Sequence, residues 1–74
     1  MVKVVSVEQY FGENAGVVWR ALKEKGALSA AQLKRVCRLS PAELYGGLGW
    51  LARENKVRIE GDKPLQYKFS LNGE

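Results

Sequence analysis

The side chains best equipped for chemistry in this sequence are its lysines and arginines. Six of them fall into two groups, one near the middle of the chain and one closer to its C-terminal end. The groups are Lys34, Arg35 and Arg38, and then Arg58, Lys63 and Lys68. Cations gathered on one surface bind the phosphates of a nucleic-acid backbone. A net charge of +4 fits that role, but many small domains carry as much, so an ordinary solvated surface is the alternative.

The residues needed for catalysis or metal binding are missing. The chain has no histidine and one cysteine, Cys37, and its acidic residues are scattered rather than paired. We therefore expect no enzyme activity, no metal, no cofactor and no small-molecule ligand. A lone cysteine cannot close an internal disulfide, which is typical of a reduced intracellular protein, and we expect Cys37 to be a small buried apolar residue.

The length and composition predict one small folded domain. The chain has 74 residues, of which 46% are hydrophobic, which is too many for a disordered chain. Its apolar start, MVKVVSV, is far shorter than the roughly 18 residues that a transmembrane helix needs. We therefore expect a cytoplasmic protein without a membrane partner.

Two segments precede the centre of the chain. The valine-rich residues 2–9 favour a short strand or an extended arm. Asn14 is then the expected N-cap of a helix, whose apolar face carries Ala15, Val18, Trp19 and Leu22 and which Gly26 ends. The predicted division is an N-terminal arm or strand over 1–11 and one domain over 12–74, with Tyr10 and Phe11 packing from the arm onto this helix.

Two capping boxes in close succession predict a tight helix-turn-helix. Ser29 with Gln32 begins one helix, and Ser40 with Glu43 begins the next, with Pro41 in its first position. The third helix buries leucines 44, 48 and 51. Residues 57–60 and 65–71 then alternate around the turn sequence GDKP, which is typical of a hairpin. The predicted fold is α+β: a three-helix core, a C-terminal β-hairpin wing and the N-terminal strand or arm.

This order of elements is the winged helix-turn-helix plan, and two stretches make the likeness closer. The combination of GENAGVVWRAL with LYGGLGWLAREN resembles a family of small stand-alone winged helix-turn-helix domains of unestablished function from bacteria and archaea. The resemblance covers about residues 12–71. It implies a domain type most often used to bind DNA, with no cofactor and no catalytic residues.

The helix expected in a DNA major groove is poorly supplied with base-reading side chains. Its outward stripe is predicted to be Ala42, Tyr45, Gly46, Gly49 and Arg53, and only Arg53, at the far end, suits base edges. DNA contact would therefore fall mainly on phosphates, through Tyr45, Arg53 and the two cationic groups.

The glycines of the same helix fit a protein interface instead. Gly46 and Gly49 are predicted to face outward between Tyr45 and Trp50, leaving a shallow groove that another helix can approach. We expect Gly47 to face the first helix, and Trp50 to be either core beside Trp19 or an exposed anchor. The arm around Val4 adds a strand that can pair with the wing, within one chain or across a homodimer.

Two hypotheses of different class remain open. The first is a transcription-regulator-like module that binds double-stranded DNA through phosphates, as a homodimer. The alternative is a protein-interaction or homodimerisation module that has lost base reading. They differ in what Gly46 and Gly49 are for: in the first the bare backbone permits close approach to the duplex, and in the second it permits close approach of another protein.

Overall fold

The computed structural model describes residues 2–73. Met1 and Glu74, at the ends of the expected arm and domain, lie outside the described residues. The elements in chain order are α1 (Val7–Lys25), β1 (Leu28–Ser29), α2 (Ala30–Cys37), α3 (Pro41–Arg53), β2 (Val57–Glu60), a short 3-10 turn η1 (Pro64–Gln66) and β3 (Lys68–Leu71). Three helices and a hairpin wing confirm the expected α+β fold. No helix in this part of the chain is long and apolar enough to cross a membrane.

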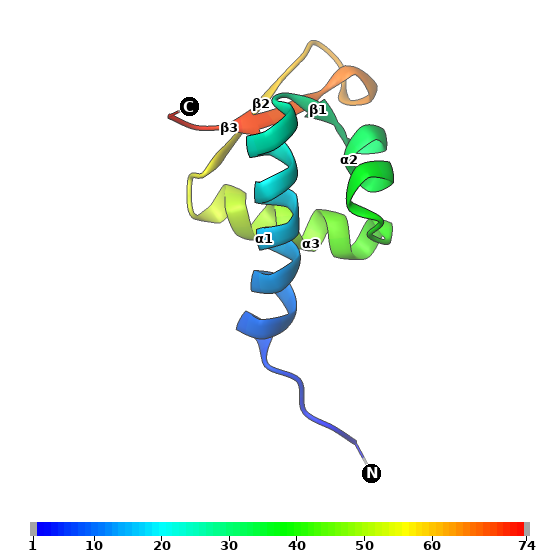
Figure 1. Cartoon of the computed structure of the whole chain (residues 1–74), viewed down its shortest axis with the longest axis vertical. Helices are drawn as coiled ribbons and strands as arrows, with labels where there is room; N and C mark the ends of the chain where they lie inside the picture. Colours follow the sequence, from blue (N-terminus) through cyan, green and yellow to red (C-terminus); the bar gives the residue numbers. More distant parts are fainter. Residues whose placement is uncertain (1, 74) are drawn as a thin grey trace.

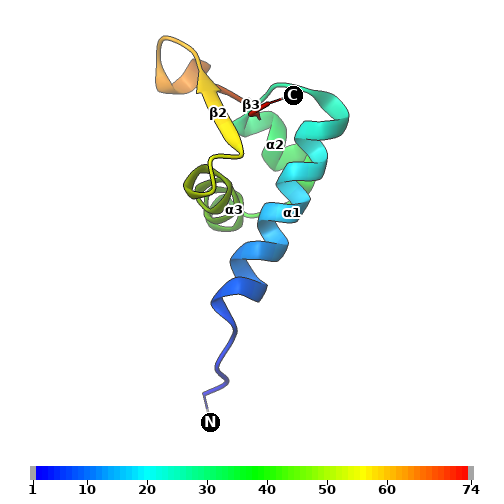
Figure 2. The ribbon, with the colours of Figure 1, turned by 90° about the vertical axis from the view of Figure 1, so that its left-hand side faces the viewer.

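The sheet lies at one end of the long helix α1, and the N-terminal residues leave from the other end (Figure 1). Helix α3 crosses beside the middle of α1, as the view along α3 shows (Figure 2). The sheet is antiparallel in the order β1-β3-β2, so the two-residue strand β1 pairs with β3 as well. No strand was predicted where β1 forms. The sheet and α3 therefore lie on the same side of the molecule.

One hydrophobic core joins the three helices and the sheet. Its most deeply buried side chains are Val18 of α1, Leu33 of α2 and Leu44 of α3. Phe69 and Leu71 of β3 close it from the sheet. The burial of α3 at leucines 44, 48 and 51 confirms the predicted inward face.

Helix α1 begins earlier than expected. Its N-cap is Ser6, whose hydroxyl accepts a hydrogen bond from the Gln9 amide at 3.2 Å. Asn14, the expected cap, lies inside the helix, so that prediction is wrong. Residues 2–6 are extended without a strand partner, and Phe11 lies on the helix rather than on an arm. The reason is tertiary: packing against α3 holds a helix across Gly12 that local propensity alone disfavours.

The helix-turn-helix forms as its caps predict. Ser29 and Gln32 exchange hydrogen bonds of 2.9 and 3.2 Å, and Ser40 and Glu43 exchange bonds of the same lengths. Between them Arg38 ends α2 in the left-handed region, with φ 58°. Because each cap is satisfied within four residues of sequence, the turn was readable without knowledge of the fold.

The wing differs from its sequence pattern in one place. Residues 64–66 form the 3-10 turn η1, so the last strand begins at Lys68 instead of Leu65. Pro64 takes the first position of this turn. Leu65 is left 98% exposed at the wing, where it contributes nothing to the core.

Candidate functional site

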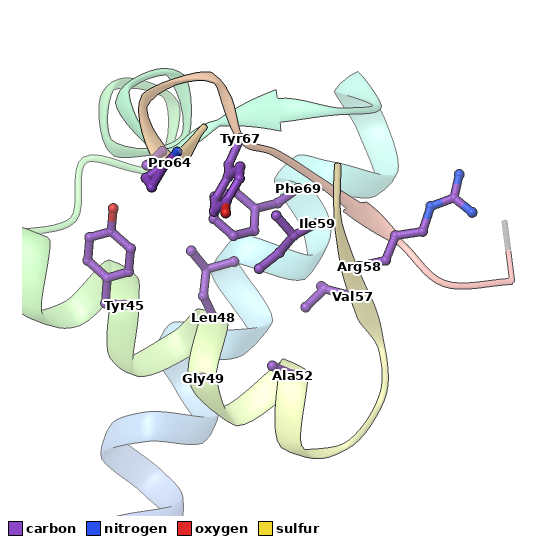
Figure 3. A pocket seen from close by; sticks show the side chains of 11 residues that line it. Tyr45, Leu48, Gly49, Ala52, Val57, Arg58, Ile59, Pro64, Tyr67 and Phe69 are labelled. Atoms are coloured by element: carbon purple, nitrogen blue, oxygen red, sulfur yellow. The ribbon is translucent and has the colours of Figure 1, made fainter. Parts of the chain in front are cut away.

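An apolar cavity of about 570 Å³ opens between α3 and the wing (Figure 3). It is lined from α3 by Tyr45, Gly49 and Ala52, and from the wing by Ile59, Pro64 and Tyr67, with Leu48 and Phe69 behind them. Figure 3 shows the rings of Tyr45, Pro64 and Tyr67 around its mouth. The cavity is therefore built by two elements that are remote in the sequence.

Side-chain periodicity explains which residues line the cavity. Tyr45, Gly49 and Ala52 are four and three residues apart, so they share one face of α3. On β2, Val57 and Ile59 point to the same side of the sheet because strand side chains alternate. A Cβ atom at Gly49 would meet nothing within 4 Å. This glycine leaves open space at the surface and no clash inside the fold requires it.

Several side chains at this surface are apolar and exposed. Tyr45 is 57% exposed and Ile59 is 54% exposed. Leu65 stands on the adjoining 3-10 turn. Exposed apolar residues grouped around a hollow mark a binding surface more often than scattered single ones do.

The wing cations lie on the other face of the sheet. Arg58 and Lys68 alternate with the inward residues of β2 and β3. The Arg58 Nε donates a hydrogen bond to the Ser70 Oγ at 3.2 Å, and its guanidinium lies 3.9 Å from the Glu60 carboxylate. Arg58 is among the residues that line the cavity, but Figure 3 shows its guanidinium directed away from it. The charged end of Arg58 therefore does not face the cavity.

The other predicted cations are spread over separate elements. Lys34, Arg35 and Arg38 are all exposed on α2 and its cap. In the described part of the chain no acidic oxygen lies within 4.0 Å of their charged groups. Arg53 is exposed in the last turn of α3, and Lys63 is exposed in the wing loop. Of the cations predicted to bind phosphate, Lys34, Arg35 and Arg38 are the three that share one helix and its cap.

The glycines of α3 separate into internal and external positions. A Cβ at Gly46 would lie 2.8 Å from the Phe11 ring, so the predicted outward orientation of Gly46 is wrong. Gly47 is buried against α1 as expected, with Asn14 and Ala15 backbone atoms 3.0 Å from a Cβ there. Gly49 alone faces outward. Close packing of α1 on α3 therefore accounts for two of the three glycines.

Trp50 does not border the same hollow as Tyr45. It is half-buried, packs against the core and lines a second cavity of about 460 Å³ together with Trp19. This arrangement favours the core interpretation of Trp50. The expected groove with Tyr45 on one edge and Trp50 on the other does not form, because a step of five residues turns Trp50 toward α1.

The single thiol is partly withdrawn from solvent. Cys37 is half-buried, packs against the core, and its Sγ lies 4.0 Å from the Val17 carbonyl oxygen. Burial raises the pKa of this thiol, because the thiolate loses solvation. Within residues 2–73 no group of three potential metal ligands gathers.

Residues 6–69 match the model of a family described as a winged helix-turn-helix domain, DUF2582. The chain belongs to this family. This winged helix is also similar to the solution NMR structure of protein BT2368 from Bacteroides thetaiotaomicron, with 40% identity and a TM-score of 0.80. The match covers 92% of this chain and 82% of that one. Among curated proteins, none matches the sequence.

Sequence reasoning about this winged helix missed several residues of the site. Ile59, Pro64 and Tyr67 line the cavity, and nothing in the sequence connects them to α3. Phe11 was assigned to the arm, although it stands four residues before Ala15 and continues the apolar face of α1. That spacing was the available signal for the early start of α1 and hence for the role of Gly46.

Proposed function

We propose that this winged helix is a protein-interaction module that forms a homodimer through the cavity between α3 and the wing. The observation that carries the proposal is the apolar lining of that cavity. Burying an exposed aromatic or branched side chain contributes about 1.5–3 kcal/mol. Tyr45 and Ile59 on each copy therefore offer a driving force that a 74-residue domain can use.

The first turn of α3, which would enter the major groove in a helix-turn-helix, lacks the donors that nucleic acid needs. The first turn of α3 presents Pro41, Ala42 and Glu43, and the Glu43 carboxylate already accepts the Ser40 amide at 2.9 Å. None of these side chains has a donor for base edges or phosphate oxygens. An apolar wall beside the helix would also leave buried phosphates without partners.

Binding of double-stranded DNA through phosphates is the second candidate, and the α2 cations support it. Lys34, Arg35 and Arg38 are exposed and unpaired in the described structure. Winged helix domains commonly bind DNA, and such contacts weaken with salt and carry little sequence information. A transcription-regulator-like role would then rest on α2 rather than on α3.

Sedimentation equilibrium tests the homodimer. We expect the wild-type protein to have the mass of a dimer. The Gly49→Leu protein should have the mass of a monomer, because the leucine side chain starts from a position with open space and fills the cavity. Gly12→Leu is the matched control, because a Cβ at Gly12 also meets nothing within 4 Å but lies on α1. A monomeric wild type, or a Gly49→Leu protein that still dimerises, would refute the proposed function.

Amide chemical shifts during titration with mixed-sequence duplex DNA test the second candidate. Salt-sensitive shifts at residues 34–38 that vanish in a Lys34→Glu, Arg35→Glu double variant would support it. An Arg20→Glu, Lys25→Glu double variant changes the net charge equally on α1 and should keep the shifts. If both double variants lose binding alike, the effect is one of net charge and no α2 site exists.

A further inference from the structure

The N-terminal arm, residues 2–6, is apolar and has no place in its own domain. Val2 is 90% exposed and Val4 is 91% exposed. The arm is extended and projects beyond the N-terminal end of α1, away from the sheet, in both views (Figures 1 and 2). An exposed β-branched segment of this kind is an aggregation hazard unless it acquires a partner.

Strand β2 has a free edge next to the cavity. Within residues 2–73, in the order β1-β3-β2, its one pairing is with β3, so half of its backbone amide and carbonyl groups point away from the sheet. The arm, residues 2–6, is long enough to pair with all four of its residues, Val57–Glu60. The chain thus carries both an unpaired extended segment and an edge that accepts one.

We propose that the arm of a second copy adds to β2 as a fourth strand and places Val4 over the cavity beside Ile59. This inference rests on the proposed homodimer and names what fills its interface. Because side chains alternate, Val2 and Val4 then face the cavity while Lys3 and Val5 face the outer side of the sheet. The two most exposed valines of the arm would both become buried.

Charge selects the strand direction. An antiparallel arm with Val4 opposite Ile59 sets Lys3 beside Glu60 and Val5 beside Arg58. A parallel arm with the same Val4 contact would instead set Lys3 beside Arg58, where like charges repel. The antiparallel register is therefore the favoured one.

A second copy supplies the arm more readily than the same chain. Ser6 caps α1 and directs residues 2–5 along the helix axis, away from the end that bears the sheet. To reach its own β2, the arm would have to reverse beside α1 and give up the Ser6 cap. In a two-fold dimer each arm reaches the partner's β2, so both edges and both cavities are covered at once and the assembly is closed.

Isotope-filtered NOEs in a sample that mixes labelled and unlabelled copies test the contact directly. We expect intermolecular NOEs from the Val4 methyls to Ile59 and Tyr67. A dimer without these NOEs overturns the inference and leaves the homodimer standing. A monomer in which Val4 contacts its own Ile59, or contacts nothing, overturns both.

A pair of variants on adjacent arm residues tests the predicted facing. Val4→Asp should weaken dimerisation by ~100-fold or more, because two valines per dimer lose their burial. Val5→Asp is the matched control and should dimerise like the wild type, since it faces Arg58 on the outer side. Both residues are exposed in the monomer, so neither change should unfold it. Equal weakening by the two variants would overturn the register.

A charge exchange tests the strand direction independently. Lys3→Glu should weaken the dimer several-fold, and Lys3→Glu combined with Glu60→Lys should restore part of the loss, because the pair is re-formed with opposite signs. An absence of restoration would overturn the antiparallel pairing, even if Val4 contacts the cavity.

Discussion

Alanine substitutions at Gly47 and Gly49 should change stability in opposite directions, although the two glycines lie in the same helix. At Gly47 a methyl group would meet backbone atoms of Asn14 and Ala15 at 3.0 Å. These atoms belong to α1 and cannot rotate away, so overpacking should destabilise the fold by about 1–3 kcal/mol. The better helix propensity of alanine offsets about 1 kcal/mol of this destabilisation. The net expectation for Gly47→Ala is a loss of up to about 2 kcal/mol.

At Gly49 only the propensity gain remains. A methyl group there meets nothing within 4 Å, so Gly49→Ala should raise the free energy of unfolding by about 1 kcal/mol. The two variants should then differ by about 1–3 kcal/mol, which for a domain of this size separates their Tm values by about 4–24 °C.

Thermal and urea unfolding at one matched protein concentration provide the assay, because any dimer makes stability concentration-dependent. Both variants should keep the helical circular dichroism of the wild type. A Gly47→Ala protein at least as stable as the wild type would refute the close approach of α1 and α3 at this point. A destabilised Gly49→Ala protein would refute the open position of Gly49.

Three further predictions follow from local geometry. Gly46→Ala should lower the free energy of unfolding in thermal melts, and Phe11→Ala should largely remove that penalty in a double-mutant cycle, because the clash is with the Phe11 ring. Ser40→Ala should lower it by about 1 kcal/mol, since the Glu43 amide loses its cap; Ser40→Asp should not. The raised pKa of the Cys37 thiol predicts slow alkylation of the folded protein. The protonated thiol therefore contributes to the stability of the folded protein. This contribution should be complete below the ordinary thiol pKa and should be lost as the pH rises through the pKa of the thiol in the folded protein, which unfolding curves in that pH range can detect.

The helix-turn-helix was readable from the sequence because its determinants are local. Ser29 and Ser40 each find their partner three residues later, and the apolar periodicity of α3 follows from helix geometry alone. The hairpin was also predicted, apart from the 3-10 turn at Pro64. Local patterns failed where a distant contact decides the outcome, as at the start of α1.

The types of side chain at the candidate site were visible in the sequence, but their grouping was not. Tyr45 and Gly49 were expected on an outward stripe, and they line the cavity. Gly46 and Trp50 were expected beside them, and they face α1. The partner of each glycine depends on which helix crosses α3 and at what distance, and a helical period contains no information on either.

The sequence by itself determined the existence of the three helices, the N-caps of α2 and α3, the hairpin and the supply of cations, because each depends on residues a few positions apart. Tertiary structure alone decided that α3 and the wing enclose a cavity and that β2 has a free edge. It also decided that the arm, residues 2–6, stands in solvent at the end of α1 away from the sheet. These relations are set by the packing of segments far apart along the chain, where the free energy of the whole core outweighs the preferences of any one segment.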